Sequence, residues 1–402
     1  MKSSILILLV IITCIAVGCG SSETFLEDLD ISKNDTIIKT VTNSDTTYKD
    51  SVVTDTIYKD TIIQDTIIRD TIIRDTIMRD TIINDVTIVD TIIVTRGYYS
   101  NPIINMSLPD PTVIRAKDNN YYLFATEDIR NTPIYKSKNL IDWEFVGTAF
   151  TDETRPNINK GNLWAPDINY VNGKYYLYYS QSTWGGEWTC GIGVAVSDKP
   201  EGPYHDHGKL FTSKEIGVQN SIDPYFIEDD GKKYLFWGSN RGIFGIELED
   251  DGLSIRKSST VTKIAAEKIM EGCYIHKRDG YYYLFGSKGS CCYGVNSSYH
   301  VILGRATNLF GPYTNRNGES MLSGAFDVFL KGNDYVKGPG HNSKFVKDDK
   351  GQDWMIYHGY LKVDADAGRI TFLDQVKWTD DGWPYIDNDS PSEKAIKPII
   401  AE

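Results

Sequence analysis

The sequence is poor in the features that mark several common protein classes. Six of its 402 residues are cysteines, and no two of them have the CxxC spacing of a zinc or redox site. Basic residues number 42 against 55 acidic ones, so the formal net charge is -13 and the pI is about 5.0. This charge balance argues against a nucleic-acid partner, because phosphate binding needs concentrated positive charge.

A long apolar run is also missing. The run Ile5–Ile12 is too short to span a bilayer and has the character of a signal-peptide core. It leads into Ala16-Val17-Gly18-Cys19, and small residues directly before a cysteine resemble a bacterial lipobox. We expect residues 1–18 to be a lipoprotein signal peptide and the acylated Cys19 to anchor an exported protein at the outer membrane or cell surface. The alternative is an ordinary secretory signal.

Cleavage there would remove Cys14 and leave four cysteines besides Cys19: Cys190, Cys273, Cys291 and Cys292. Export permits disulfides, but a chain of this size does not depend on them for its core. The sequence does not reveal which of the four are paired.

The next segment, residues 19–96, contains a five-residue repeat. From Asp35 to Val94 the chain runs in units such as Asp65-Thr66-Ile67-Ile68-Arg69. A period of five fits neither a helical stripe nor one face of a strand, and Thr and Ile favour extended chain. The segment is therefore predicted to be a stalk or linker that lifts the following domain off the membrane. The alternative is a β-solenoid or a multi-chain β-stalk, because the paired Ile residues favour burial.

Aromatic residues are abundant in the remaining 97–402 segment of a chain with 26 Tyr and 8 Trp. Five stretches share one plan: a polar residue, a short apolar strand, a turn at Gly, Asn or Asp, and an aromatic strand. The aromatic strands are Tyr121–Phe124, Tyr175–Tyr179, Tyr234–Trp237, Tyr281–Phe285 and Trp354–Tyr357.

These stretches predict an all-β domain, a five-bladed β-propeller. Repeats of about 40–50 residues built from short strands are typical of propeller blades. Two further strands, Ile192–Val196 and Val301–Arg305, complete their blades. Equivalent positions in different blades form a ring, so we expect the leading polar residues to meet at one mouth of the central channel. They are Asp110, Asp167, Asp223, Glu271 and His341.

Such a ring suits glycoside hydrolysis. Like charges at close range raise one another's pKa, so one carboxyl group can stay protonated while another is ionised. The protonated group donates to the leaving oxygen, and the ionised group activates water. Taken singly, an Asp-Pro pair more often marks a turn.

The ordered motifs resemble glycoside hydrolase family 43, over about Gly97 to Ser392. The resemblance is carried by Leu108-Pro109-Asp110-Pro111, Leu163-Trp164-Ala165-Pro166-Asp167, Asn220-Ser221-Ile222-Asp223-Pro224 and Glu271-Gly272. It implies that Asp110 is the general base, that Asp223 orients the acid and modulates its pKa, and that Glu271 is the general acid. The family inverts configuration, which implies that base and acid lie about 6.5–9.5 Å apart.

Within that family, three segments are most similar to endo-1,5-α-L-arabinanases: Gly289–Gly294, Gly338–His341 and Asp381–Pro384. The resemblance implies that His341 helps to hold a calcium or similar ion on the propeller axis. One imidazole without a carboxylate cage is a poor calcium site, so water would complete the shell. The alternative for His341 is a neutral side chain bonded to backbone.

The same mapping implies substrate-binding residues. Trp164 would stack on a furanose face, unless it only packs between blades. Gly185 would allow close approach of the chain to the sugar, and polar groups would come from Asn220, Ser221 and Ser239. Asp167 is expected to support the site. Cys273, which follows the acid's glycine, departs from the family pattern and is a poor nucleophile candidate.

These observations predict an enzyme that hydrolyses α-1,5-linked arabinofuranosyl bonds in plant cell-wall arabinan. A second hypothesis keeps the fold but makes the enzyme an exo-acting arabinofuranosidase, β-xylosidase or galactosidase. A third makes it a surface glycan-binding lipoprotein without turnover. The intact carboxylate triple distinguishes the hydrolases from the binder.

Overall fold

The computed structural model describes residues 97–400 and six strands before them. The chain divides into two units, Met1–Arg96 and Gly97–Glu402. In the first, the strands β1 (Thr36–Asn43), β2 (Ser51–Val53), β3 (Thr56–Ile62), β4 (Thr66–Ile73), β5 (Thr76–Ile83) and β6 (Val86–Ile93) form an antiparallel sheet in the order β1-β6-β5-β4-β3-β2. The predicted signal peptide and Cys19 lie outside the described residues, and the stalk stays a prediction.

The second unit is a five-bladed, all-β propeller, as predicted. Each of the first four blades is one four-stranded antiparallel sheet. They are β8 (Thr112–Arg115), β9 (Tyr121–Phe124), β10 (Pro133–Ser137) and β11 (Trp143–Thr148); β12 (Asn162–Val171), β13 (Lys174–Ser182), β14 (Gly191–Ser197) and β15 (His205–Thr212); β16 (Tyr225–Asp229), β17 (Lys232–Trp237), β18 (Ile243–Glu247) and β19 (Thr262–Ala265); and β20 (Glu271–Arg278), β21 (Tyr281–Lys288), β22 (His300–Ala306) and β23 (Asp327–Leu330).

The fifth blade contains β24 (Val336–Gly340), β25 (Val346–Lys347), β26 (Asp353–Leu361), β27 (Ile370–Trp378) and β28 (Pro384–Tyr385). The short strand that the shared plan places directly after the leading residue His341 is not formed: residues 341–345 separate β24 from β25, and both of those strands pair with β26. The predicted strands Ile192–Val196 and Val301–Arg305 are confirmed as β14 and β22.

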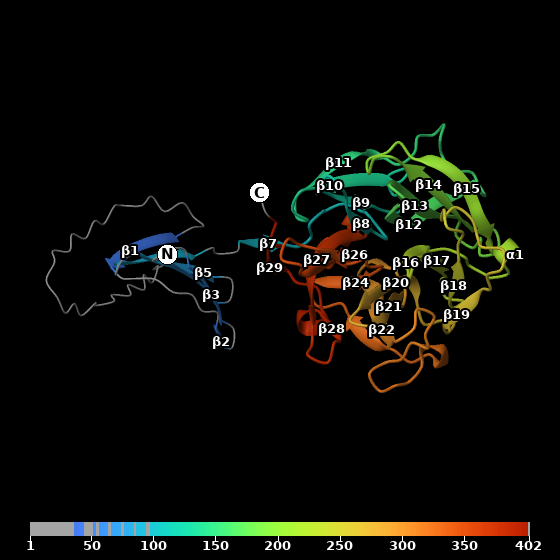
Figure 1. Cartoon of the computed structure of the whole chain (residues 1–402). Coiled ribbons are helices and arrows are strands. Elements are labelled where there is room, and N and C mark those ends of the chain that lie inside the picture. Colours follow the sequence, from blue (N-terminus) through green and yellow to red (C-terminus); the bar gives the residue numbers. More distant parts are fainter. Residues whose placement is uncertain are drawn as a thin grey trace. The chain divides into compact units, whose positions relative to one another are not determined.

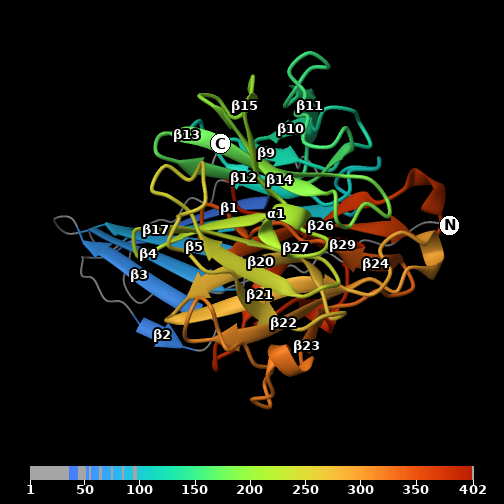
Figure 2. The same ribbon diagram turned by 90° about the vertical axis from the view of Figure 1, so that its right-hand side faces the viewer.

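The first strand of each blade lies nearest the common centre (Figure 1), and Figure 2 shows the same sheets from a direction at right angles. The second strands are aromatic because adjacent blades pack against their faces, while strands of the same sheet flank their edges. All four residues of β9 are buried, and Tyr178 of β13 stacks on Phe226 of β16 with 5.2 Å between the ring centroids. Burial of such rings supplies most of the favourable free energy between blades.

The ends of the propeller chain meet beside the fifth blade. β7 (Tyr98–Ser100) pairs with β29 (Lys394–Ile396). The buried Asn101 accepts a hydrogen bond from the Leu373 N–H (3.0 Å) and donates to the Leu373 carbonyl (2.9 Å) and to the Ser392 carbonyl (3.0 Å). One side chain thus joins the first segment, β27 and the last segment.

Helices are few and short in the described part of the chain. They are α1 (Ser213–Ile216) and the 3-10 turns η1 (Gly294–Asn296), η2 (Met321–Ser323), η3 (Ala365–Ala367) and η4 (Asp387–Asp389). None of the helices described has the length and apolar character needed to cross a membrane.

Candidate active site

Each blade has one corner residue with a left-handed backbone conformation, within its first strand or no more than two residues from it. These five residues are Asp110 (φ 55°), Ala165 (41°), Asp223 (59°), Gly272 (58°) and His341 (47°). A positive φ is unfavourable for residues with a side chain, so the surrounding contacts must hold the corner. The corners turn the chain at the mouth of the channel and aim their neighbours into it.

A side chain from the preceding blade secures four of the five corners. The N–H of Ala165 donates to Thr126 Oγ1 (2.7 Å), and the N–H of Asp223 donates to Ser180 Oγ (2.8 Å). In the same way, the N–H of His341 donates to Ser287 Oγ (2.7 Å), and the N–H of Asp110 donates to His358 Nδ1 (2.9 Å). In the fourth blade the corresponding position of the preceding strand is Gly238, which has no side chain. There the Gly272 N–H donates instead to Asp223 Oδ2 (3.1 Å).

The predicted ring of five leading residues is only partly right, because two of the five are not corner residues. Asp110, Asp223 and His341 are corners, whereas Glu271 precedes its corner and Asp167 follows its corner by two residues. Asp110, Asp223, Glu271 and His341 nevertheless line one cavity. Asp167 does not; it lies in the narrower channel beneath, where the Lys344 ammonium is 3.0 Å from its carboxylate. The proline after three of the corners (Pro111, Pro166 and Pro224) is the sequence signal that would have placed the blades in register.

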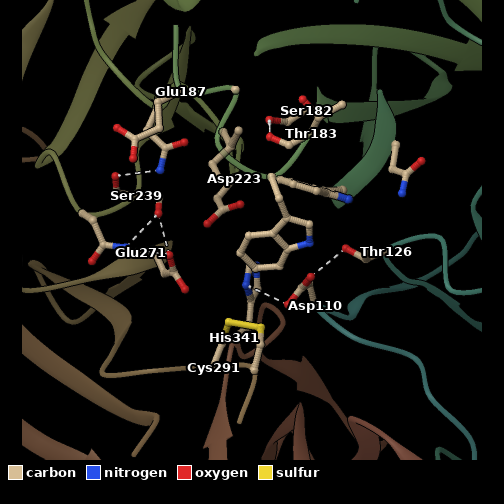
Figure 3. A pocket seen from close by; sticks show the side chains of 18 of the residues that line it. Asp110, Thr126, Ser182, Thr183, Glu187, Asp223, Ser239, Glu271, Cys291 and His341 are labelled. Atoms are coloured by element: carbon tan, nitrogen blue, oxygen red, sulfur yellow. Dashed lines mark hydrogen bonds and ion pairs between the residues drawn. A yellow bond between two sulfur atoms is a disulfide. The ribbon is translucent and has the colours of Figure 1, made fainter. Parts of the chain in front are cut away.

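The cavity has a volume of about 790 Å³. Asp110, Asp223 and Glu271 project into it from different strands and sides (Figure 3). This is the convergence on which the sequence-based hydrolase hypothesis depends.

Asp110 is held as a carboxylate. Its Oδ2 accepts from Thr126 (2.7 Å), and its Oδ1 is 3.0 Å from the Arg369 guanidinium and 3.2 Å from His341 Nδ1. Burial opposes ionisation, but the charge of Arg369, the nearby imidazole of His341 and the Thr126 bond outweigh it. Together they hold the pKa of Asp110 well below its usual range.

Glu271 is fixed at both carboxyl oxygens. Oε1 accepts from the hydroxyl of the buried Tyr299 (2.8 Å), and Oε2 accepts from Ser239 (2.5 Å) and from the Asn240 amide (3.4 Å). Ser239, predicted to touch substrate, lines the cavity and also orients this carboxyl group.

Asp223 lies close enough to interact with both other carboxylates. Burial, and then the negative charges of Glu271 and Asp110, raise the pKa of Asp223 well above its ordinary value. Asp110 is therefore held ionised, whereas ionisation of Asp223 beside Glu271 is disfavoured. Divergent pKa values among neighbouring carboxyl groups are typical of catalytic sites.

Four of the five predicted substrate-binding residues line the cavity. They are Trp164, Gly185, Asn220 and Ser239. Trp164 lies 5.6 Å from the ring of Trp184, which is 80% exposed.

Ser221 is the exception and is corrected. Its side chain is fully buried; the hydroxyl donates to the Val218 carbonyl (2.8 Å) and accepts from the Trp237 indole (3.0 Å). The side chain packs inside the third blade because its neighbour Asn220 takes the exposed place. A polar residue type in a motif does not reveal which side of the chain it faces.

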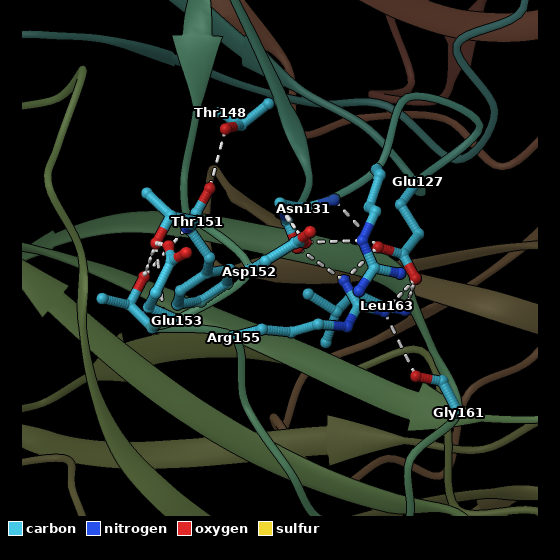
Figure 4. Close-up of polar contacts among 12 residues, drawn as sticks. Glu127, Asn131, Thr148, Thr151, Asp152, Glu153, Arg155, Gly161 and Leu163 are labelled. Atoms are coloured by element: carbon cyan, nitrogen blue, oxygen red, sulfur yellow. Dashed lines mark hydrogen bonds and ion pairs between the residues drawn. The ribbon is translucent and has the colours of Figure 1, made fainter.

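The wall beside Trp164 is supported by residues that sequence reasoning missed. Glu127 pairs with Arg155 and accepts from the backbone N–H of Leu163 (2.8 Å) and of Asn131 (3.0 Å) (Figure 4). The Arg155 guanidinium also donates to the Gly161 carbonyl (3.2 Å). Thr126, Arg369 and His358 were missed as well, because no local motif links them to Asp110, which they contact.

His341 faces both the cavity and the channel beneath it. That channel holds a space of about 30 Å³, room for one water or ion. It is lined by Asn342, whose Oδ1 is buried without a hydrogen-bond partner. Within the described ranges, no group of three or more His, Cys, Asp or Glu side chains has a metal-binding arrangement. One imidazole and one amide oxygen would suit an ion only if water supplied most of its ligands.

Comparisons with known proteins agree with this geometry. Residues 99–384 match the family described as glycosyl hydrolases family 43. An extracellular exo-α-(1→5)-L-arabinofuranosidase of Cellvibrio japonicus is 32% identical over 73% of this chain and 88% of its own length. An extracellular endo-α-(1→5)-L-arabinanase of Bacillus subtilis is 33% identical over 70% of this chain and 88% of its own length.

Solved structures show the same likeness. An α-L-arabinanase of Cellvibrio cellulosa in complex with arabinohexaose superimposes with a TM-score of 0.64 at 31% identity, over 70% of this chain and 95% of that one. The family match spans well over half of the sequence and contains all three carboxylates. The chain therefore belongs to glycosyl hydrolases family 43.

Proposed function

We propose that this enzyme hydrolyses α-1,5-linked L-arabinofuranosyl bonds in arabinan with inversion at the anomeric carbon. The observation that carries the proposal is the convergence of Asp110, Asp223 and Glu271 in one cavity with opposed pKa shifts on the two aspartates. The relatives named for arabinan supply the substrate class.

In the proposed mechanism, ionised Asp110 takes a proton from a water that attacks the anomeric carbon. Glu271 gives a proton to the departing glycosidic oxygen, so that water adds across the broken bond. Asp223, whose carboxyl group accepts from the Gly272 N–H, fixes the backbone directly after Glu271.

The decisive experiment replaces Asp110 and Glu271 separately by Ala and measures the release of reducing ends from linear arabinan. Loss of the base or the acid is expected to lower kcat by about 10²–10⁴-fold. Asp387→Ala, at an exposed carboxylate on η4, is the matched control. Near-normal turnover by either folded variant would refute the assignment. Tight binding of arabinan by the unsubstituted protein without any reducing-end release would favour a glycan-binding role.

We propose endo action, although the two relatives above are named for different modes. A cavity of about 790 Å³ exceeds one sugar ring, and it extends to the exposed rings of Trp184 and Tyr293. Early appearance of long oligomers in the digest would support endo cleavage. Monosaccharide alone would support the exo hypothesis, and monosaccharide from xylan would support a β-xylosidase.

We further propose that His341 and Asn342 help to hold a hydrated calcium or similar ion, which would add positive charge near the carboxylates. Supporting observations are the small channel space and the unpartnered Asn342 Oδ1. Removal of the ion by chelator should lower the melting temperature and activity, with recovery on adding calcium. An unchanged melting temperature and an ion-free protein by elemental analysis would contradict it.

We also propose that the chain is exported and anchored through Cys19, in line with the lipobox-like sequence and with the extracellular relatives. Cys19→Ala should release the protein from the membrane fraction of the expressing cell. Incorporation of labelled fatty acid by the Cys19→Ala variant would exclude this attachment site.

A further inference from the structure

Two adjacent cysteines, Cys291 and Cys292, form a disulfide in the wall of the cavity. Both side chains are partly exposed, and Figure 3 shows the bridge among the residues that line the cavity. A bond between neighbouring residues closes a small covalent ring that includes their peptide bond. The two sulfurs therefore cannot turn away from each other, and they present a fixed surface to any molecule in the cavity.

The loop that carries the bridge is tied to Glu271. The Ser297 hydroxyl donates to the Ser290 carbonyl (2.7 Å), and the Ser290 N–H donates to the Ser298 hydroxyl (3.1 Å). Directly after these residues, Tyr299 donates to Glu271. The disulfide is thus held at a defined place relative to the carboxyl group that would protonate the leaving oxygen.

The bridge adds an apolar surface to a mainly polar cavity. Carboxylates, amides and hydroxyls make up most of the lining, and they suit the hydroxyl groups of a sugar. A furanose also has C–H faces, which gain from contact with polarisable apolar atoms. A disulfide has no hydrogen-bond donor, whereas two reduced thiols are weak donors that rotate independently.

We propose that the Cys291–Cys292 disulfide is a sugar-contacting element of this site: its sulfurs pack against the C–H face of a furanose unit beside the bond that is cleaved. The proposal rests on the proposed function. Reduction of the bridge would then weaken substrate binding and leave the acid and base in place.

The test compares the unsubstituted enzyme before and after a phosphine reductant with a variant that carries both Cys291→Ser and Cys292→Ser. KM for linear arabinan should rise about fivefold on reduction, the scale of one lost apolar contact, with kcat changed less than twofold. The variant should show the raised KM without reductant and no further response to it. Cys190 and Cys273 are buried, and burial raises the pKa of both thiols, so alkylation after mild reduction should label Cys291 and Cys292.

An unchanged KM in the reduced enzyme and in the variant would overturn the proposal. A lower kcat at unchanged KM would also overturn it, because the bridge would then only hold the loop that leads to Tyr299. If the unsubstituted enzyme does not cleave arabinan, the proposed function fails separately. Calorimetric titration with an α-1,5-linked arabino-oligosaccharide then decides: affinity that falls about fivefold on reduction supports the contact, and absent or unchanged binding refutes it.

Discussion

At the scale of single residues, the ionisation of Asp110 depends on Arg369. The guanidinium and Asp110 are joined at 3.0 Å although they lie 259 positions apart in the sequence. Among the groups that favour the carboxylate, Arg369 opposes the effect of burial most strongly. The base is therefore maintained by a residue from another blade.

We expect Arg369→Met to move the acid limb of the kcat/KM profile to higher pH. The pKa of Asp110 is depressed in the intact enzyme, so removal of the cation raises it by about 1–3 pH units and Asp110 is protonated at a pH where it was ionised before. Activity should be lost first at acidic pH and least at alkaline pH. Arg369→Lys keeps the charge and should keep most of the profile. An acid limb that does not move in Arg369→Met would exclude this ion pair as the cause.

The Thr126 hydroxyl makes two hydrogen bonds, one to the proposed base and one to a corner of the next blade. It donates to Asp110 Oδ2 and accepts from the N–H of the Ala165 corner, both at 2.7 Å. Thr126→Val should lower kcat about tenfold, the worth of one hydrogen bond to a charged group. Thr126→Ser retains the hydroxyl and should behave like the unsubstituted enzyme. Equal kcat values for the Val and Ser variants would show that the hydroxyl has no role.

At the scale of elements, the corner bonds connect each blade to the one before it. Ser180, at the end of β13, accepts the N–H of the Asp223 corner. Ser180→Ala leaves that buried N–H without a partner, so the free energy of unfolding should fall by about 1–3 kcal/mol. Ser180→Thr imitates the first blade, where Thr126 holds this place, and should lose less. Urea unfolding measures both; equal midpoints for the Ala variant and the unsubstituted protein would contradict the bond.

The channel beneath the site contains a second connection between blades. Lys344, which follows the corner of the fifth blade, pairs with Asp167 of β12 and donates to the Ile168 carbonyl. Lys344→Met leaves a buried carboxylate unpaired and should destabilise the fold by about 3–5 kcal/mol. Adding Asp167→Asn should recover part of this loss. Lys377→Met, at an exposed pair, is the control and should have little effect. Additive losses in the double variant, measured by urea unfolding, would exclude the coupling.

At the scale of the whole molecule, Asn101 connects the two ends of the propeller chain. Its amide satisfies both backbone groups of Leu373 and reaches Ser392. Asn101→Ala should lower the free energy of unfolding by about 1–3 kcal/mol, because the buried Leu373 N–H loses its partner, whereas the Leu373 carbonyl keeps the hydrogen bond from the Tyr99 hydroxyl (2.6 Å). Asn317→Ala, at an exposed amide in a turn, is the control. A melting temperature within the error of the unsubstituted protein would show that the ends are held by other contacts.

The sequence is most informative where one strand carries its own signal. The aromatic strands and the Asp-Pro motifs identify the blades, the cavity residues Asp110 and Asp223, and the family. Register is harder to predict: Asp167 aligns with the corner residues in sequence because both patterns have a carboxylate near an apolar strand. Contacts between distant strands, such as that of Arg369 with Asp110, leave no local pattern, so they emerge only from the fold.

The corner bonds also define what could be exchanged in a chimaeric enzyme. A corner N–H belongs to one sheet, and its hydrogen-bond acceptor belongs to the sheet before. A transplanted sheet therefore brings the donor for one junction and the acceptor for the next, but neither of their partners. The smallest self-consistent module is offset: the second strand of one sheet together with the first strand of the next. Recombination points placed after the first strand of a sheet should therefore yield more folded hybrids than points placed between sheets.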